Sequence, residues 1–397
     1  MAKLIEITGK ALSGEWGKDD ETGNGVPVLR TTNFTNEGII DYNSVVTRTI
    51  TKKNIGEKFL RKGDIIIEKS GGSDKFPVGR VVYFDGDDNT YLFNNFTGLL
   101  RVKEPKMWYP RYVFYSLFAN YKRGGTRMFE NKTTGLHNLK TDDYVSRYEV
   151  TEIDMIEQVS VCDKLDKLYE IINERKQQLE LLDELVKARF VELFGDPRSN
   201  PFAFEKKMLK DTCKVITGNT PSRAIAEYYG DYIEWIKTDN IVSGILNPTQ
   251  ATESLSEKGM NVGRTVEKDS ILMACIAGSI ASIGRVCITD RTVAFNQQIN
   301  AVVPEQYNIL FLYVLLQMSK DYLVEDINMA LKGILSKSKL EEKEFIIPPM
   351  DLQEQFSDFV KQVDKSKVIL YYKNRKGGFP PLLFIYSVTT ITNLPGC

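Results

Sequence analysis

Residues 165–193 decide the fold, and they read LDKLYEIINERKQQLELLDELVKARFVEL. Apolar side chains recur there in alternating steps of three and four, and an arginine takes the place of an apolar residue at two positions. This spacing is the heptad pattern of a coiled coil, sustained for about four heptads. The positions on the seam are Leu165, Leu168, Ile172, Arg175, Leu179, Leu182, Val186, Arg189 and Leu193.

The pattern predicts a continuous helix over residues 154–193, which would be ~60 Å long at ~1.5 Å per residue. Gly195-Asp196-Pro197 ends it, because glycine and proline do not easily continue a helix. A second helix with the same rhythm is predicted over residues 351–375, and Ser366 interrupts its seam. The apolar positions of this second seam are Leu352, Phe356, Phe359, Val363 and Leu370.

Each seam is longer than one small domain could cover, so we expect the two helices to pack against each other in antiparallel orientation. The alternative is that each seam packs only on its own domain. The expected interface residues are Leu165, Leu168, Ile172, Leu179, Leu182, Val186, Phe356, Phe359 and Val363.

The chain also repeats itself at an offset of about 200 residues, and repeats of this kind indicate a duplicated unit. Each match is weak alone, but all of them occur in the same order. Residues 28–33 return as 235–240, 62–66 as 268–272, 78–81 as 283–286, 93–94 as 295–296, 135–136 as 333–334 and 154–158 as 351–355.

Each copy is predicted to be an α+β block followed by its long helix, because short β-branched runs alternate with one helical pattern. The expected strands are 64–67, 79–84 and 99–102, with counterparts at 271–273, 284–288 and 300–303, and the expected helices lie near 112–121 and 310–319. The predicted domains are 1–153 and 196–350, the helices 154–195 and 351–375, and an atypical tail 376–397.

Composition is that of an ordinary globular protein, with 42% hydrophobic and 26% charged residues and a net charge of −1. Cations are nevertheless concentrated early: residues 48–80 hold nine Lys and Arg against four acids, and residues 101–147 hold ten against four. Such local excess can serve nucleic-acid binding or simply form a solvated surface. The five scattered cysteines fit a reducing cytoplasm, and we expect neither a secretory signal nor a transmembrane helix.

Motifs of catalysis are missing from the sequence. It contains no GxGxxG, GxxxxGK[ST], HExxH or GxSxG, and its single histidine is His137. Cysteine and histidine do not cluster as a zinc site requires. Asp196 with residues 205–207 has the loose spacing of a metal-dependent nuclease, but that spacing is common by chance. We therefore expect no catalytic residue and no metal site.

Several segments resemble the specificity subunit of type I restriction-modification systems. Residues 217–222, 228–230 and 235–241 are similar to the opening of that family's target recognition domain, and residues 194–197 to the exit from its central helix. Residues 346–349 and 352–355 resemble the entry to its distal helix. The first copy departs from the pattern at residues 13–17 and 150–153. The resemblance covers roughly residues 1–375.

The resemblance implies a reader of double-stranded DNA with two recognition domains, separated by helices that fix the unread gap between two parts of the target. It also implies two modification subunits, which carry S-adenosylmethionine and flip an adenine, and two restriction subunits, which use ATP and Mg²⁺. This chain would hold no cofactor. A non-enzymatic coiled-coil scaffold that binds proteins without DNA, and a self-sufficient nuclease or methyltransferase, are the alternatives.

Candidate DNA contacts follow from chemistry, because phosphates attract Lys, Arg and backbone N–H groups whereas base edges pair with Asn, Gln and Arg. The alternatives are ordinary turns for the glycine-rich loops and structural hydrogen bonds for the amides. The candidates are Arg30, Thr31, Asn33, Lys69, Ser70, Asn94, Lys122, Arg123, Arg127, Ser222, Arg223, Lys237, Thr238, Asn240, Ser279, Asn296 and Gln297.

After Lys376 the sequence is apolar, lacks heptads and ends in Cys397. The second helix is also predicted to be shorter than the first. We hypothesise a truncated or frame-shifted product; the alternative is a natural tail that covers the exposed seam.

Overall fold

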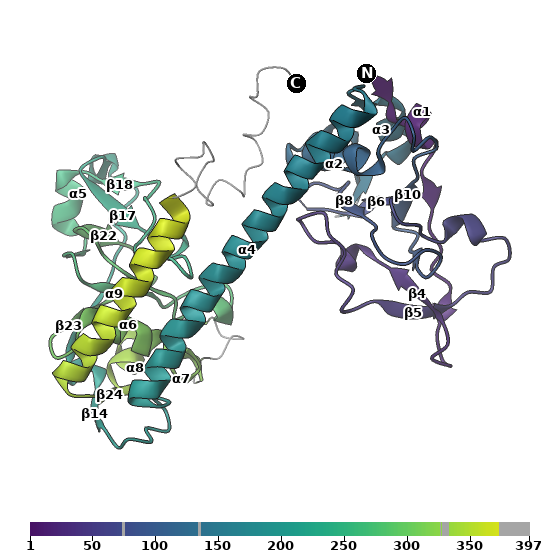
Figure 1. Ribbon diagram of the computed structural model, residues 1–397. Coiled ribbons are helices and arrows are strands. Elements are labelled where there is room, and N and C mark those ends of the chain that lie inside the picture. The colour runs from purple at the N-terminus through teal and green to yellow at the C-terminus, as the bar shows by residue number, and fades with distance from the viewer. Residues whose placement is uncertain (74–75, 134–135, 326, 328–332, 373–397) are drawn as a thin grey trace. The chain divides into compact units, whose positions relative to one another are not determined.

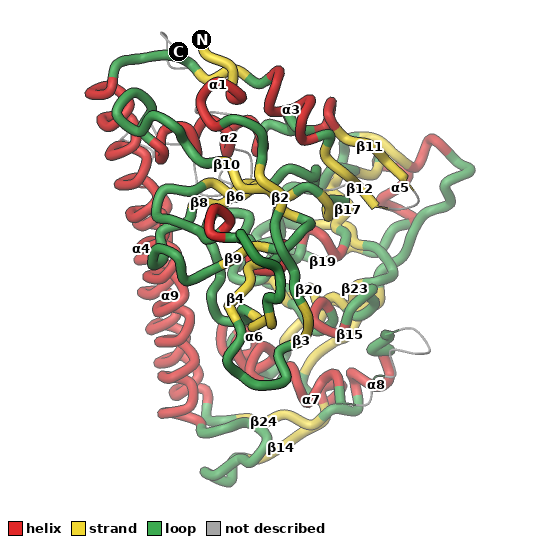
Figure 2. The backbone as a smooth tube through the Cα atoms, turned by 90° about the vertical axis from the view of Figure 1, so that its right-hand side faces the viewer, coloured by secondary structure: helices red, strands yellow, loops and turns green. Residues whose placement is uncertain are grey.

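The computed structural model describes residues 1–73, 76–133, 136–325, 327 and 333–372. The chain divides into two compact units, which are described separately: unit 1 contains Met1–Glu174 and unit 2 contains Arg175–Lys373 (Figure 1). Helix α4 (Met155–Phe194) begins in unit 1 and ends in unit 2, and helix α9 (Met350–Tyr372) belongs to unit 2. These are the two long helices that the heptads predict, and they stand out from the shorter elements (Figure 2).

Unit 1 is built from small sheets and three short helices. Its antiparallel sheet has the order β2-β10-β6-β8, and a second sheet has the order β3-β5-β4-β9, in which β4 and β9 are parallel. The strands of these sheets are β2 (Leu12–Ser13), β10 (Thr97–Leu100), β6 (Ile65–Glu68), β8 (Val81–Tyr83), β3 (Lys18–Asp19), β5 (Val46–Thr49), β4 (Val26–Leu29) and β9 (Leu92–Phe93). The smaller sheets are β11-β12-β7 and β1-β13, with β11 (Glu130–Thr133), β12 (Leu136–Leu139), β7 (Ser70–Gly71), β1 (Ala2–Lys3) and β13 (Glu149–Val150).

Helix α2 (Pro110–Lys122) covers β8 and forms much of the core of unit 1. Pro110 stands at its first position, where proline favours a helix. Val113, Leu117 and Tyr121 repeat every four residues on one face and are buried. The remaining helices of unit 1, α1 (Leu4–Thr8) and α3 (Thr141–Arg147), pack on each other.

Unit 2 repeats the plan of unit 1. Its sheet β15-β23-β20-β21 corresponds to β2-β10-β6-β8, and the parallel pair β17/β22 corresponds to β4/β9. The strands are β15 (Cys213–Thr217), β23 (Ile299–Pro304), β20 (Ile271–Ala274), β21 (Val286–Ile288), β16 (Tyr229–Gly230), β18 (Ser254–Leu255), β17 (Ile233–Ile236), β22 (Val293–Phe295), β19 (Thr265–Val266), β14 (Glu205–Met208) and β24 (Glu344–Ile347). The short helices are α5 (Glu257–Val262), α6 (Ile309–Met318), α7 (Lys320–Val324) and α8 (Lys337–Glu341). The predicted duplication of an α+β block followed by a long helix is confirmed. One of the sequence matches, 135–136 with 333–334, includes Gly135, which lies outside the described residues.

The structure corrects the last match of the repeat. Buried Gln158 accepts a hydrogen bond from the backbone N–H of Tyr109 at 2.8 Å, and buried Gln353 accepts one from the N–H of Asn308 at 2.9 Å. Each glutamine thus joins the start of a long helix to the N-cap residue of another helix, α2 in unit 1 and α6 in unit 2. Gln158 therefore corresponds to Gln353, two residues before the Gln355 that sequence matching selects.

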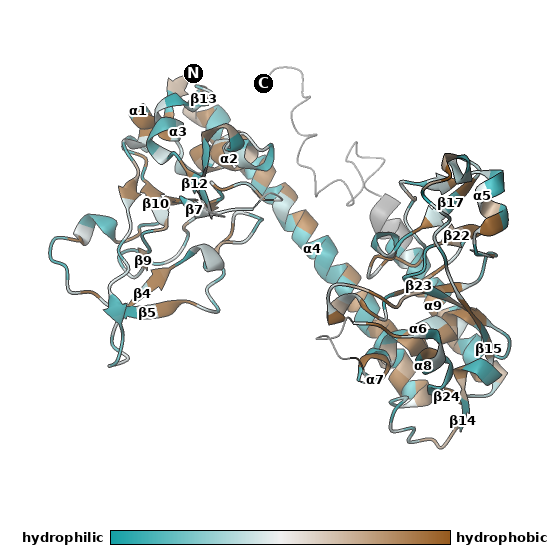
Figure 3. Cartoon of the chain, turned by 180° about the vertical axis from the view of Figure 1, so that it is seen from behind, coloured by the Kyte–Doolittle hydropathy of each residue, from teal (hydrophilic) through white to brown (hydrophobic). Residues whose placement is uncertain are grey.

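The two long helices pair antiparallel in unit 2 around an aromatic cluster. Phe190 and Phe194 of α4 lie 5.5 and 5.6 Å from Phe356 of α9, measured between ring centroids. Further along, Lys367 of α9 contacts Asp183 of α4, so the residue numbers run in opposite directions along the pair. Figure 3 shows how apolar and polar residues alternate along α4.

The seam residues divide between the two units. Val186, Phe356 and Val363 are buried in the core of unit 2, and Leu182 and Phe359 pack against it. Leu165 instead packs on the core of unit 1. The other described seam residues of α4 are half-buried: Leu168, Ile172 and Leu179. The side chain of Leu370 is outside the described part of the structure. Among the described residues, no helix is long and apolar enough to cross a bilayer.

We predict that Lys367→Leu destabilises unit 2. The ammonium group of Lys367 lies 2.5 Å from Asp183 and 3.6 Å from Asp364, and its side chain is only 17% exposed. Without this cation the two carboxylates face each other, while burial already raises the pKa of Asp364. Because the acids are partly exposed, we expect a loss of about 1 kcal/mol in the free energy of unfolding, measured by urea denaturation.

Lys361→Leu is the matched control, since Lys361 is 57% exposed and pairs with Asp358 of the same helix at 2.9 Å. Equal losses of stability in the two variants would contradict a role for Lys367 between the helices.

Candidate nucleic-acid interface

Each unit carries the same loop-and-turn arrangement on its surface. In unit 1 the loop after β2 lies against the turn that follows β9; in unit 2 the loop after β15 lies against the turn that follows β22. A Cβ atom at Gly14 would collide with the backbone oxygens of Phe93 and Asn94, and one at Gly218 would collide with those of Phe295 and Asn296. Only glycine allows so close an approach of two backbones.

Four predicted base-contacting amides are buried instead. The amide oxygen of Asn33 accepts from the N–H of Arg30 at 2.9 Å, and that of Asn240 accepts from the N–H of Lys237 at 2.9 Å. Asn94 and Asn296 are 5% and 6% exposed. Burial leaves these four side chains little surface to offer a base edge, and the amides of Asn33, Asn240 and Asn296 are hydrogen-bonded within the fold, which was the alternative.

In unit 2 the surface beside this arrangement holds two cations around one acid. The Arg223 guanidinium lies 2.6 Å from one carboxylate oxygen of Glu253, and the Lys237 ammonium contacts the other. Arg223 also stacks on aromatic rings, with its Cζ 4.4 Å from the Tyr229 centroid and 5.1 Å from that of Trp235. Hydrogen bonds from Lys237 and Arg223 lower the pKa of Glu253, so the acid is ionised and fixes both cations.

Unit 1 has a comparable group of lysines. Lys69 donates to the hydroxyl of Ser13 at 3.0 Å, and Lys52 and Lys58 lie 3.0 and 3.2 Å from the carboxylate of Glu15. Burial lowers the pKa of Lys69, while a hydrogen bond from Lys52 lowers that of Glu15. Lys52 and Lys58 together outnumber the single acid that they share, Glu15, and this excess of positive charge suits a phosphate backbone.

The turns themselves present exposed side chains. Asn95 and Phe96 are exposed at the turn of unit 1, and Gln297 is exposed at that of unit 2. The oxygen of Gln297 accepts a hydrogen bond from the hydroxyl of Thr220, which ties the turn to the neighbouring loop. Phe96 is not among the candidate contacts, although the match of residues 93–94 with 295–296 already places it opposite Gln298.

The other candidates are distributed over both units. Arg123 and Arg127 are exposed after α2, and half-buried Lys122 lies over the ring of Phe118. Ser222 and Ser279 are exposed in unit 2. The remaining candidates are half-buried and hydrogen-bonded within the fold. Arg30 donates to the backbone carbonyl of Ser44, and Ser70 bonds to Asn138. The backbone carbonyls of Thr31 and Thr238 accept hydrogen bonds from Arg80 and Arg285, respectively.

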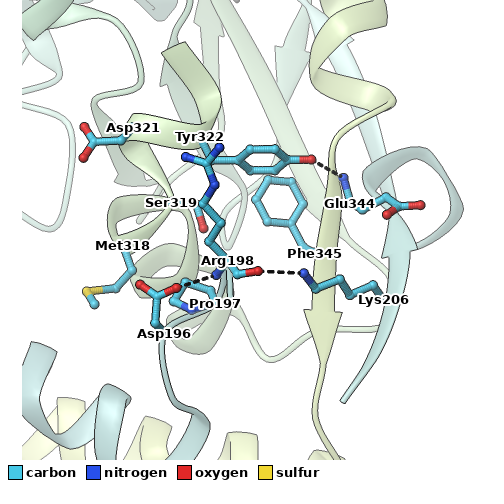
Figure 4. A pocket seen from close by; sticks show the side chains of 10 residues that line it. All are labelled: Asp196, Pro197, Arg198, Lys206, Met318, Ser319, Asp321, Tyr322, Glu344 and Phe345. Atoms are coloured by element: carbon cyan, nitrogen blue, oxygen red, sulfur yellow. Dashed lines mark hydrogen bonds between the residues drawn. The ribbon is translucent and has the colours of Figure 1, made fainter. Parts of the chain in front are cut away.

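A pocket of about 230 Å³ lies at the end of α4 (Figure 4). Its lining includes Asp196 and Lys206, two of the residues whose spacing loosely resembles that of a metal-dependent nuclease. Asp196 accepts a hydrogen bond from the N–H of Arg198 at 3.0 Å, and Lys206 donates to the carbonyl of Arg198 at 3.0 Å. Both side chains thus hold their own loop. Among the described residues, no group of three or more His, Cys, Asp or Glu side chains could hold a metal ion.

We predict that Gly218→Ala destabilises unit 2 by about 1–3 kcal/mol, because the added methyl group must displace backbone oxygens rather than a flexible side chain. Thermal or urea denaturation measures the change. Gly278→Ala is the control, since a Cβ at Gly278 meets no atom within 4 Å. Equal stability of the two variants would contradict the close approach at Gly218.

Comparison with known proteins agrees with this architecture. Residues 201–375 match the family model of the type I restriction modification DNA specificity domain. The chain is 34% identical over 120 residues to the HindI type I restriction enzyme specificity subunit of Haemophilus influenzae, a match that covers 30% of this chain and 25% of that protein. It is 26% identical over 183 residues to the MjaIX specificity subunit of Methanocaldococcus jannaschii, covering 43% of this chain and 41% of that protein. The matches thus span less than half of either relative.

Two solved structures share the fold. The crystal structure of a type I restriction-modification S subunit from M. genitalium has a TM-score of 0.56 at 14% identity and covers 94% of this chain and 91% of that one. A chain from a structural study of complex assembly and conformational transition in a type I system has a TM-score of 0.51 at 14% identity, covering 94% and 93%. The chain thus resembles type I restriction-modification specificity subunits: residues 201–375 match the family's domain, two curated specificity subunits are similar over part of their length, and the fold is shared with two solved structures.

Proposed function

We propose that this chain reads a bipartite DNA target, one part with each unit, and directs adenine methylation and cleavage by partner subunits. The observation that carries the proposal is the duplicated loop-and-turn surface, in which the buried residues match and the exposed residues differ. A protein with two readers on one scaffold can recognise two different short sequences.

The charges around each turn support DNA as the ligand. The two surfaces carry Lys52, Lys58 and Lys69 in unit 1, and Arg223 and Lys237 in unit 2. Contacts to phosphate fix the register of a protein on the duplex, whereas exposed amides beside them read base edges. Glu15 holds Lys52 and Lys58, and Glu253 holds Arg223 and Lys237, in defined positions before DNA arrives.

The helix pair would set the unread gap between the two parts of the target. The aromatic cluster of Phe190, Phe194 and Phe356 and the ion pair between Lys367 and Asp183 make the pairing rigid within unit 2. A rigid spacer of fixed length favours one separation of half-sites over all others.

Chemistry would come from the partners. In the proposed complex, two modification subunits hold S-adenosylmethionine, two restriction subunits use ATP and Mg²⁺, and this chain contributes neither a cofactor nor a catalytic residue. The assembly would act in the cytoplasm, where the genome is.

A scaffold that binds only proteins is the second candidate. Leu181 and Leu185 of α4 are 55% and 48% exposed, so this helix presents apolar surface that a partner helix could cover. The two functions differ in one measurable property, because only the reader binds duplex DNA with an affinity that falls steeply with salt.

The deciding experiment is co-expression of this chain with a cognate modification subunit, followed by mapping of N6-methyladenine across the host genome. We expect one two-part motif with a fixed gap. A stable complex without any motif would contradict sequence reading, and failure to form a complex would favour the scaffold.

We also predict that Arg223→Ala weakens binding to the mapped target and lowers the slope of log Kd against log salt by about 1, because one phosphate contact is lost. Fluorescence anisotropy over a series of salt concentrations measures the slope. Arg198→Ala is the control, since Arg198 lies in the loop after α4, is 68% exposed and pairs with Glu325. An unchanged slope for Arg223→Ala would remove Arg223 from the interface.

A further inference from the structure

The turns that follow β9 and β22 have the same backbone. Asn94 donates to the carbonyl of Leu29 at 2.9 Å, and Asn296 donates to that of Ile236 at 3.0 Å. Two residues later, the carbonyl of Phe96 accepts from the backbone N–H groups of Lys69 and Ser70, and the carbonyl of Gln298 accepts from those of Cys275 and Ile276. Phe96 and Gln298 are therefore equivalent positions in the two units.

The side chains at this position differ in a way that packing does not explain. Gln298 folds back on Asn296, whose amide nitrogen donates to the Gln298 side-chain oxygen at 3.2 Å, while Asn296 accepts from the N–H of Gln298 at 3.1 Å. In unit 1 the phenylalanine provides no such acceptor and is 53% exposed. The buried side-chain oxygen of Asn94 has no hydrogen-bond partner among the described residues.

Phe96 thus exposes a large apolar side chain to water at a position where unit 2 has a half-buried glutamine that accepts a hydrogen bond from Asn296. The shared backbone does not require the phenylalanine, because glutamine occupies the equivalent position of unit 2. An exposed aromatic side chain that the scaffold does not require is typical of a site that contacts something outside the chain.

We propose that Phe96 reads a thymine in the part of the target bound by unit 1, by packing its ring against the C5 methyl group. The inference rests on the proposed function. Phenylalanine makes this apolar contact in the major groove, where thymine is the base that carries a methyl group. The backbone N–H of Lys69 donates to the carbonyl of Phe96, and its ammonium bonds Ser13, so a cation for the flanking phosphate belongs to the segment that hydrogen-bonds this turn.

The same position explains how one scaffold reads two different sequences. Unit 2 presents the amide of Gln297, which suits an adenine edge, and turns Gln298 inward. Unit 1 presents Asn95 and an aromatic ring. The backbone, the buried asparagine and the close glycine are common to both units, and only the side chains at the tip change the preferred base.

The test uses the complex of this chain with its modification subunit and the target mapped by adenine methylation. Each thymine of the target is replaced in turn by uracil, which lacks only the methyl group, and Kd is measured by fluorescence anisotropy. We expect one replacement to weaken binding about 4-fold, the loss that corresponds to one buried methyl group. Phe96→Gln should bind the thymine and uracil duplexes equally.

Phe96→Gln is expected to fold, because glutamine occupies the equivalent position of unit 2, and its melting temperature checks this. Phe202→Gln is the matched control: Phe202 is 54% exposed, lies in the loop after α4, and should leave the uracil effect intact. A target without a uracil-sensitive thymine, or a Phe96→Gln complex that keeps the sensitivity, would overturn the inference. The absence of any methylation motif with the unaltered chain would instead overturn the proposed function, and this inference with it.

Discussion

The packing of four phenylalanines supports the arrangement of the chain. Phe190 and Phe194 of α4, Phe311 of α6 and Phe356 of α9 lie within one cluster, with ring centroids 4.8 to 6.4 Å apart. Their burial attaches both long helices to the globular part of unit 2 and fixes the antiparallel pairing at that end. The large apolar area of aromatic side chains makes such a cluster a strong anchor. The apolar seam of α4 beyond it could not by itself orient the helix relative to a domain.

Duplication separates the residues that build the scaffold from those that can carry specificity. Gln158 and Gln353 make the same hydrogen bonds at the start of the long helices, and Gly14 and Gly218 make the same close approach. These buried positions tolerate little change because backbone groups depend on them. The exposed positions at the turns have no such constraint, so the two units can diverge there without loss of the fold. The difference between Phe96 and Gln298 is of this kind.

The buried asparagines show where reasoning from residue type fails. Asn and Gln are the side chains that pair with adenine edges, but they also satisfy backbone groups that strands and helices leave unpaired. Asn33 and Asn240 cap the short turns after β4 and β17 through hydrogen bonds of 2.9 Å. The sequence contains the same residue types for both purposes. Burial distinguishes them, and burial is a property of the folded chain.

Local and periodic signals in the sequence were sufficient to predict the architecture. The heptads of residues 165–193 predicted α4, the shared order of short motifs predicted two copies of an α+β block, and the segments around residues 217–241 indicated the family that the chain resembles. These signals are local or periodic, so they can be recognised in the sequence without knowledge of the fold. Tertiary structure alone decided the register of the last repeat, the clustering of Arg223 and Lys237 around Glu253, and the exposure of Phe96. These features depend on how separate segments pack in the folded chain, and a local or periodic sequence pattern does not encode that packing.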